Sequence, residues 1–322
     1  MNTRYIEFDI MKGIGIMFMI IGHLTPYMTN VIFSFHMPLF FIVSGYFYKP
    51  TILNDSLKKD FKRLLIPYIA TALIVIAYYL LLSIARKTDL VSEWIIAAMY
   101  GGSSSHDSII LADMPMIGAI WFLLALFWCK NIYNIIASKV TDPKKTFVLC
   151  LIISFTAIII YKEIISLPFS INQGLSALIF YNIGHQIRQR GRFENINKTL
   201  VAVLLLLWIF AFNFSELYMV DCTFNILPLD ILGAVGGTIL IYYISRFVKN
   251  IKYISKILAY VGINSLAFLC IHLIDLNAPT SWCFRIQSEF RVIYDIAFCF
   301  IIVFSFSKLK LTKRIYNIQN LQ

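Results

Sequence analysis

Charged residues are scarce in this sequence. Asp, Glu, Lys and Arg make up 14% of its 322 residues, whereas a soluble globular domain carries about a quarter. Hydrophobic residues reach 59%, and the mean hydropathy is +0.77. This composition excludes an ordinary soluble globule and predicts a polytopic membrane protein.

Several catalytic and binding motifs are also missing. The sequence holds no phosphate-binding P-loop, no GxSxG elbow, no HExxH and no DxD run. ATP-driven transport, serine-esterase chemistry, zinc hydrolysis and nucleotide-sugar glycosyl transfer therefore lack support. The six cysteines show no CxxC pair and no Cys/His spacing typical of a metal site, so no metal is expected. The N-terminus lacks a signal-peptide pattern, and the first apolar segment is expected to stay as a signal anchor.

Ten apolar segments can be marked as membrane spans from their length and hydropathy. No internal repeat or linker separates them, so we predict an all-α membrane protein with one domain over residues 1–322. The stretch Glu93–Tyr100 is too short to span and is predicted to be interfacial or re-entrant. The ten predicted helices are Ile10–Met28, Val31–Tyr48, Leu64–Ile84, Met116–Ala137, Phe147–Tyr161, Gly174–Arg188, Leu200–Asn213, Leu227–Phe247, Ile257–Ile274 and Val292–Phe306.

The basic residues alternate between the predicted loops. Five alternate segments hold 20 Lys and Arg residues, and the intervening loops hold four. Because Lys and Arg accumulate in cytoplasmic loops, this bias places both termini in the cytoplasm and requires an even number of spans. It also accounts for the net charge of +11 without a nucleic-acid partner; the expected surroundings are a lipid bilayer.

The first two predicted helices carry ionisable residues at their ends or within them: Asp9, Lys12, His23 and His36. Such groups are costly at membrane depth and indicate a functional site. Lys12 and His23 are separated by about 20° around a helix and about 16 Å along it. With a short outer link at Thr29–Asn30, His23 and His36 are both predicted to lie about 8 Å below the outer end.

Two glycines, Gly15 and Gly22, share the face of the first helix that carries Lys12 and His23. Small residues let a ligand or another helix approach the backbone closely. A purely structural interpretation stays open, in which the polar residues are satisfied within the membrane and the glycines only tighten helix packing.

The residue types suggest a division of roles. A neutral imidazole is well suited to take a proton from an alcohol near neutral pH. Of His23 and His36, one would be the base and the other an orienting or oxyanion-stabilising partner. Lys12, with Asp9 nearby, offers a cation for an anionic cofactor that enters from the cytoplasm.

These motifs resemble the integral-membrane acyltransferase 3 family, whose members O-acylate surface carbohydrates. The resemblance covers nearly the whole chain, and its most specific part is the run around His36. The similar stretches are DIMKGIGI at 9–16 with Gly22-His23, FHMPLFF at 35–41 with SGY at 44–46, IWFL and ALF at 120–127, and Ser265 with Ile271-His272.

The resemblance implies acetyl transfer from cytoplasmic acetyl-CoA to a hydroxyl of an extracytoplasmic carbohydrate or glycolipid acceptor. His23 would be the catalytic base or relay, and His36 would polarise the thioester or bind the sugar. Lys12 would hold CoA, with Asp9 beside it. Gly15 and Gly22 would form the wall of the channel for the pantetheine arm.

Three further residues are expected to contact the substrate, namely Ser44, Trp121 and His272. The expected location is the bacterial cytoplasmic (inner) membrane. The alternatives are a transporter or flippase that uses the same polar cavity without acyl-transfer chemistry, and a structural or sensor membrane protein. No motif selects the acceptor hydroxyl or the acyl chain.

Overall fold

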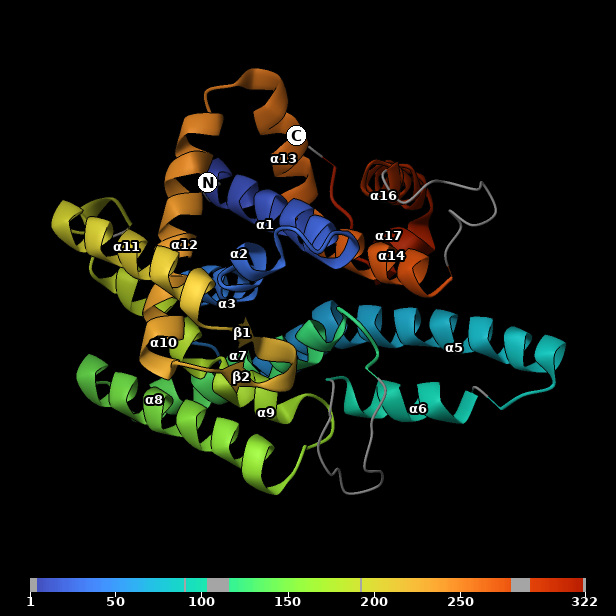
Figure 1. Cartoon of the computed structure of the whole chain (residues 1–322), viewed down its shortest axis with the longest axis horizontal. Helices are drawn as coiled ribbons and strands as arrows, with labels where there is room; N and C mark the ends of the chain where they lie inside the picture. The colour runs from blue at the N-terminus through green and yellow to red at the C-terminus, as the bar shows by residue number, and fades with distance from the viewer. Residues whose placement is uncertain (1–4, 90, 103–115, 192, 279–289, 321–322) are drawn as a thin grey trace.

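The computed structural model describes residues 5–89, 91–102, 116–191, 193–278 and 290–320, and these residues are almost entirely helical (Figure 1). Within these ranges, the strands β1 (Leu217–Tyr218) and β2 (Thr223–Phe224) form one short antiparallel pair. The predicted all-α class is confirmed.

The helices of the first half run from the N-terminus to residue 164. They are α1 Ile6–Leu24, α2 Thr29–Phe33, α3 His36–Tyr46, α4 Leu53–Asp60, a π-helical turn Phe61–Leu65, α5 Ile66–Arg86, α6 Val91–Tyr100, α7 Trp121–Lys139, α8 Pro143–Ile159 and a second π-helical turn Ile160–Ile164.

The helices of the second half begin at residue 171. They are α9 Ile171–Ser176, α10 Leu178–Gln189, a 3₁₀ turn Phe193–Asn195, α11 Lys198–Phe214, a 3₁₀ turn Met219–Asp221, α12 Leu227–Val248, α13 Lys252–Ile263, α14 Ser265–Asn277, α16 Arg291–Lys308 and α17 Lys310–Ile315.

Five helical stretches of the described residues are long and apolar enough to cross a membrane, or six if α13 and α14, bent by 76°, count as one span. Each predicted segment coincides with helical structure, but the count of ten is not confirmed. One reason is charge: α1 contains Glu7, Asp9 and Lys12, and α16 contains Arg291, Asp295 and Lys308. The side on which the termini lie stays a prediction.

The first helix lies one turn nearer the N-terminus than the sequence indicated, at Ile6–Leu24 instead of Ile10–Met28. Thr25 is extended (φ −134°, ψ 134°) because it precedes Pro26, and proline disfavours a helical residue before it. The predicted link at Thr29–Asn30 is therefore wrong, since both residues begin α2. His23 lies in the last turn of α1, so its predicted depth also changes.

Helix α1 runs through the middle of one half of the molecule, with α12, α13 and α3 around it (Figure 1). The approach to α13 is close at two glycines. A Cβ on Gly262 would lie 1.7 Å from the backbone oxygen of Asp9, and one on Gly13 would lie 2.1 Å from that of Leu258. Only glycine allows this backbone contact, which holds the polar start of α1 in place.

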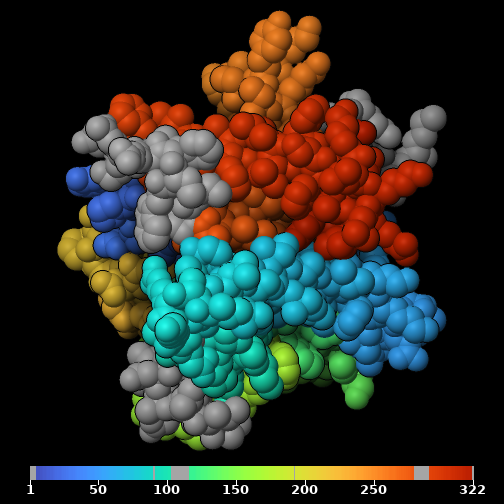
Figure 2. Space-filling view, turned by 90° about the vertical axis from the view of Figure 1, so that its right-hand side faces the viewer, coloured from blue at the N-terminus to red at the C-terminus, as the bar shows by residue number. Residues whose placement is uncertain are grey.

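Helices α5 and α6 lie side by side at one edge of the molecule (Figure 1). The rings of Tyr79 and Trp94 stack between them with centroids 4.2 Å apart. Helix α6 covers the stretch expected to be interfacial or re-entrant. Figure 2 shows α16 and α17 above α5 on this face of the molecule.

We expect Gly262→Ala to destabilise the protein, because its new methyl group meets a backbone atom that cannot move alone. Overpacking of this kind costs about 1–3 kcal/mol. Gly15→Ala is the matched control in α1, since its methyl group would meet side-chain atoms and no backbone atom: the tip of Phe40 at 3.0 Å and Leu39 at 3.5 Å. Thermal unfolding of the detergent-solubilised variants measures the difference; equal stability of the two would contradict the close-packing argument.

Candidate active site

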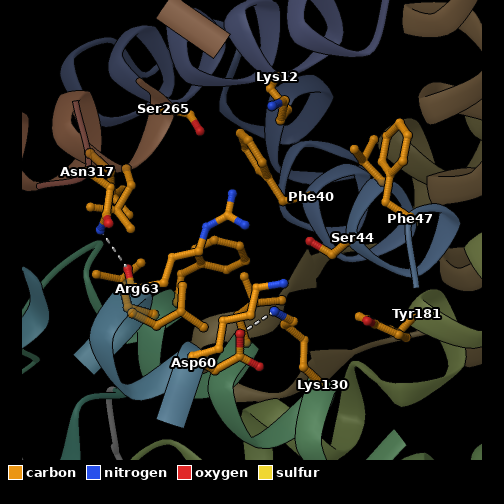
Figure 3. Close-up of a pocket in the computed structure, with 18 of the residues that line it drawn as sticks. Lys12, Phe40, Ser44, Phe47, Asp60, Arg63, Lys130, Tyr181, Ser265 and Asn317 are labelled. Atoms are coloured by element: carbon orange, nitrogen blue, oxygen red, sulfur yellow. Dashed lines mark hydrogen bonds and ion pairs between the residues drawn. The ribbon is translucent and has the colours of Figure 1, made fainter. Parts of the chain in front are cut away.

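A cavity of about 440 Å³ lies between α1, α3, α4 with the π-helical turn that follows it, α7 and the bend between α13 and α14. Its wall is mixed. Apolar side chains such as Ile16, Met19 and Phe122 line one part, and polar residues including Ser44 and Ser265 line another. Figure 3 shows both serines directed into the cavity.

The cavity carries a strong excess of positive charge. Five cationic side chains line it, and Asp60 is the one acidic residue among its described lining residues. Arg63 extends its guanidinium group into the space between α1 and α7 (Figure 3). The cations come from α1, the loop after α3, α4, the following π-helical turn and α7: Lys12, Lys49, Lys59, Arg63 and Lys130.

Two of these cations form ion pairs. Lys130 Nζ lies 2.5 Å from Asp60 Oδ1, and Lys12 Nζ lies 2.9 Å from Asp9 Oδ1. The Asp60 and Asp9 side chains are 2% and 11% exposed, so each carboxylate is largely desolvated and its lysine supplies the needed counter-charge. The Lys12 side chain, 26% exposed, still lines the cavity.

One face of α1 leads from this basic region toward His23. Lys12, Ile16 and Met19 line the cavity at helical spacing. His23 continues the same face four residues after Met19, about 6 Å further along the axis. Because α1 is continuous from Ile6 to Leu24, Lys12 and His23 are about 16 Å apart along it.

His23 belongs to a chain of three polar side chains at this end of α1. Its Nδ1 lies 3.1 Å from Nε2 of His272 on α14, and the two ring planes differ by 5°. Nδ1 of His272 lies 2.7 Å from Oδ2 of Asp295 on α16. His272 and Asp295 are fully buried, whereas His23 is exposed. This series of three side chains therefore runs from the buried carboxylate of Asp295 to the accessible imidazole of His23.

This order of contacts determines the tautomers when Asp295 is ionised. A carboxylate only accepts hydrogen bonds, so His272 must donate through Nδ1–H, which leaves its Nε2 as an acceptor. His23 then donates through Nδ1–H to His272, and its own Nε2 carries the lone pair. The atom of His23 that can take a proton is thus the one directed away from His272.

His36 lies beside this chain, at the first position of α3. It is 4% exposed, and its Nδ1 lies 3.0 Å from the carbonyl oxygen of Ile32, to which it donates. The Phe33 ring contacts both histidines, with centroids 5.8 Å from His23 and 4.8 Å from His36. The two histidines, both near helix ends, therefore contact the same ring. The sequence predicted that they lie at one depth, and that stays a prediction.

The remaining predicted site residues are placed differently. Ser44 lines the cavity. Gly15 packs against Phe40, whose ring lines the cavity, and Gly22 packs against Phe33. Trp121 is 5% exposed and contacts Phe122 edge-to-face at 6.4 Å. The roles assigned to these four residues stay predictions.

Sequence reasoning did not assign five residues that the structure brings into the site: Lys59, Asp60, Arg63, Lys130 and Asp295. Lys59 and Arg63 entered the sequence analysis only among the 20 basic residues of the alternate segments. Lys130 and Asp60 are 70 residues apart, so nothing local in the sequence indicates their pairing. In the described part of the chain, no cluster of three or more His, Cys, Asp and Glu side chains is arranged for a metal ion.

Comparison with known proteins defines the class. Residues 5–309 match the model of a family described as an acyltransferase domain. Together with its apolar helices, this makes the chain a membrane acyltransferase. The chain belongs to the acyltransferase 3 family.

Two curated relatives are similar over part of the chain. They are the nodulation proteins NolL of Mesorhizobium japonicum and of Sinorhizobium fredii, each 30% identical over 139 residues. The alignment covers 39% of this chain and 34% of each relative, so the chain matches about a third of their length. No solved structure matches the chain.

Proposed function

We propose that this acyltransferase moves an acetyl group from acetyl-CoA to a hydroxyl of a carbohydrate or glycolipid acceptor, at the bacterial cytoplasmic membrane. The observation that carries the proposal is the face of α1 that begins at Lys12 in a basic cavity and reaches His23. One end suits an anionic donor, and the other end holds an accessible base.

The charge of the cavity supports CoA as the donor. CoA carries a diphosphate and a further phosphate, and Arg and Lys bind phosphate through charge-assisted hydrogen bonds. Arg63, Lys59 and Lys49 line the cavity together with Lys12. The distance of about 16 Å from Lys12 to His23 along α1 is comparable to the reach of an extended pantetheine arm. The apolar wall at Ile16 and Met19 would accompany that arm toward His23.

In the proposed reaction, Nε2 of His23 takes the proton from the acceptor hydroxyl as its oxygen attacks the thioester carbonyl. The new bond joins that oxygen to the acetyl carbon, and the bond between the carbon and sulfur breaks. The proton on His23 then passes to the departing CoA thiolate, so that the products are the acetyl ester and free CoA.

Asp295 and His272 would assist His23 without touching the substrate, because both are fully buried. For His272 this role replaces the substrate contact that the sequence suggested. The buried carboxylate keeps His272 in the tautomer that accepts from His23, and it stabilises the positive charge that forms when His23 is protonated. His36 donates through Nδ1 to Ile32, so its neutral form offers only an acceptor at Nε2. This nitrogen can accept a hydrogen bond from the hydroxyl of the carbohydrate, whereas a thioester oxygen has no hydrogen to donate.

Replacing His23 by Ala should reduce acetyl transfer by about 10²–10⁴-fold, since a general base contributes that much. Release of CoA from acetyl-CoA by the purified protein, together with mass spectrometry of surface glycans for lost ester groups, measures the effect. Full activity of His23→Ala would show that this mechanism is wrong.

Lys12→Ala should weaken donor binding and raise the KM for acetyl-CoA by about tenfold, the equivalent of about 1.4 kcal/mol. Lys249→Ala is the matched control, because Lys249 also pairs with an acid of α1, Glu7, at 3.0 Å, and is not among the described lining residues of the cavity. If both variants change the KM equally, Lys12 has no specific role toward the donor.

Asp295→Asn should lower kcat and leave the KM for acetyl-CoA unchanged. An amide N–H facing Nδ1 of His272 would reverse both tautomers and place a proton on Nε2 of His23. Asp230→Asn is the control, since Asp230 is also buried (2% exposed) and accepts a hydrogen bond from the Ile226 N–H at 3.0 Å. Equal loss of kcat in Asp295→Asn and Asp230→Asn would contradict the positioning role of Asp295.

A further inference from the structure

The segment that follows α17 returns to the cavity. After α17, Tyr316 and Ile318 are buried, each 3% exposed, whereas Asn317 and Gln319 are exposed. One pair of side chains is therefore packed inside the protein, and the other pair stays accessible. Asn317 has φ +52°, a left-handed conformation that asparagine tolerates well. We refer to residues 316–319 as the strap.

Packing fixes the strap against two helices. The ring of Tyr316 stacks on Phe306 of α16 with centroids 5.7 Å apart. Its hydroxyl accepts a long hydrogen bond of 3.5 Å from Thr71 Oγ1 on α5. The backbone N–H of Ile318 donates to the backbone carbonyl oxygen of Lys313 at 3.0 Å. Tyr316 and Ile318 thus account for the structural stability of the strap.

Polar contacts join the strap to two parts of the cavity wall. The Asn264 side chain, at the bend between α13 and α14, donates to the carbonyl oxygen of Gln319 at 3.1 Å and accepts from its N–H at 2.8 Å. The Asn317 amide donates to the carbonyl oxygen of Arg63 at 3.4 Å (Figure 3). The strap therefore bridges the bend and the π-helical turn that carries Arg63.

The strap is also part of the wall itself. Tyr316, Asn317 and Gln319 line the cavity beside Arg63, Asn264 and Ser265. The family match ends at residue 309, so the strap lies outside the matched region. The side chains that line the cavity from the exposed positions are amides, and amide N–H groups bind phosphate oxygens.

We propose that the strap is a donor-binding element of this chain, which completes the basic end of the cavity around a phosphate group of the donor. Gln319 contributes its side-chain amide to the phosphate. The Asn317 amide, which donates to the carbonyl oxygens of Arg63 and Ile315, holds the backbone from which the Arg63 guanidinium extends. The identity of the donor as an acyl-CoA rests on the function proposed above.

Two truncations of the full chain test the strap, with a stop after Tyr316 or after Gln319. The first removes residues 317–322 and with them three of the four strap residues; the second removes only residues 320–322, keeps all four strap residues and is the matched control. Binding of CoA to the detergent-solubilised proteins is measured by titration calorimetry. We expect the dissociation constant to rise about tenfold after the first stop, and to stay unchanged after the second.

The double variant Asn317→Ala/Gln319→Ala keeps the buried anchors and the backbone bonds to Asn264. It is the decisive variant if the shorter truncation does not fold, and we expect it to weaken CoA binding about three- to tenfold. In the intact chain, CoA should also slow hydrogen exchange of a peptide that covers residues 310–319.

The outcomes separate this inference from the proposed function. If the intact chain binds CoA and the double variant binds it equally well, the inference is wrong and the proposed donor stands. If the intact chain does not bind CoA, both are overturned. Weaker binding in the double variant, with unchanged thermal stability, supports the strap as a binding element.

Discussion

Polar groups inside an apolar helical bundle must find their partners within the chain, because hydrocarbon offers none. Three buried carboxylates of this protein follow that constraint, each against a basic side chain on another helix. Asp60 meets Lys130, Asp275 meets Arg291, and Asp295 meets His272. These pairs are costly to separate once desolvated. They connect α4 with α7 and α14 with α16, and so hold the two ends of the site in register.

The same need for partners inside the protein fixes both ends of helix α1. Its polar start is held by the glycine contact with α13 and by the pair of Lys12 with Asp9. Its far end is held by the contact of His23 with His272. A single rigid helix thus sets the separation of the basic cavity from the imidazole, and in the proposed reaction that separation must match the length of the donor.

The sequence predicted the functional side chains of α1 and α3 better than it predicted the ends of the helices. Lys12, His23 and His36 are indicated by their rarity in apolar segments, and helix geometry predicts that Lys12 and His23 share one face. The π-helical turn after Asp60 and the extended Thr25 depend on local backbone details that shift helix ends. For that reason the sequence predicted the existence of the helices better than the ends of the first helix and the position of the link after it.

The sequence by itself indicated the class of the protein and its helical content, and it singled out three residues of the candidate site, because hydropathy and helical periodicity act within one segment. Only the tertiary structure decided that His272 and Asp295 stand behind His23, and that Arg63 and the strap share the cavity with Lys12. His23 and His272 are 249 positions apart in the sequence, and Arg63 and Asn317 are 254 positions apart. No local pattern specifies such pairs, since they depend on how the helices pack.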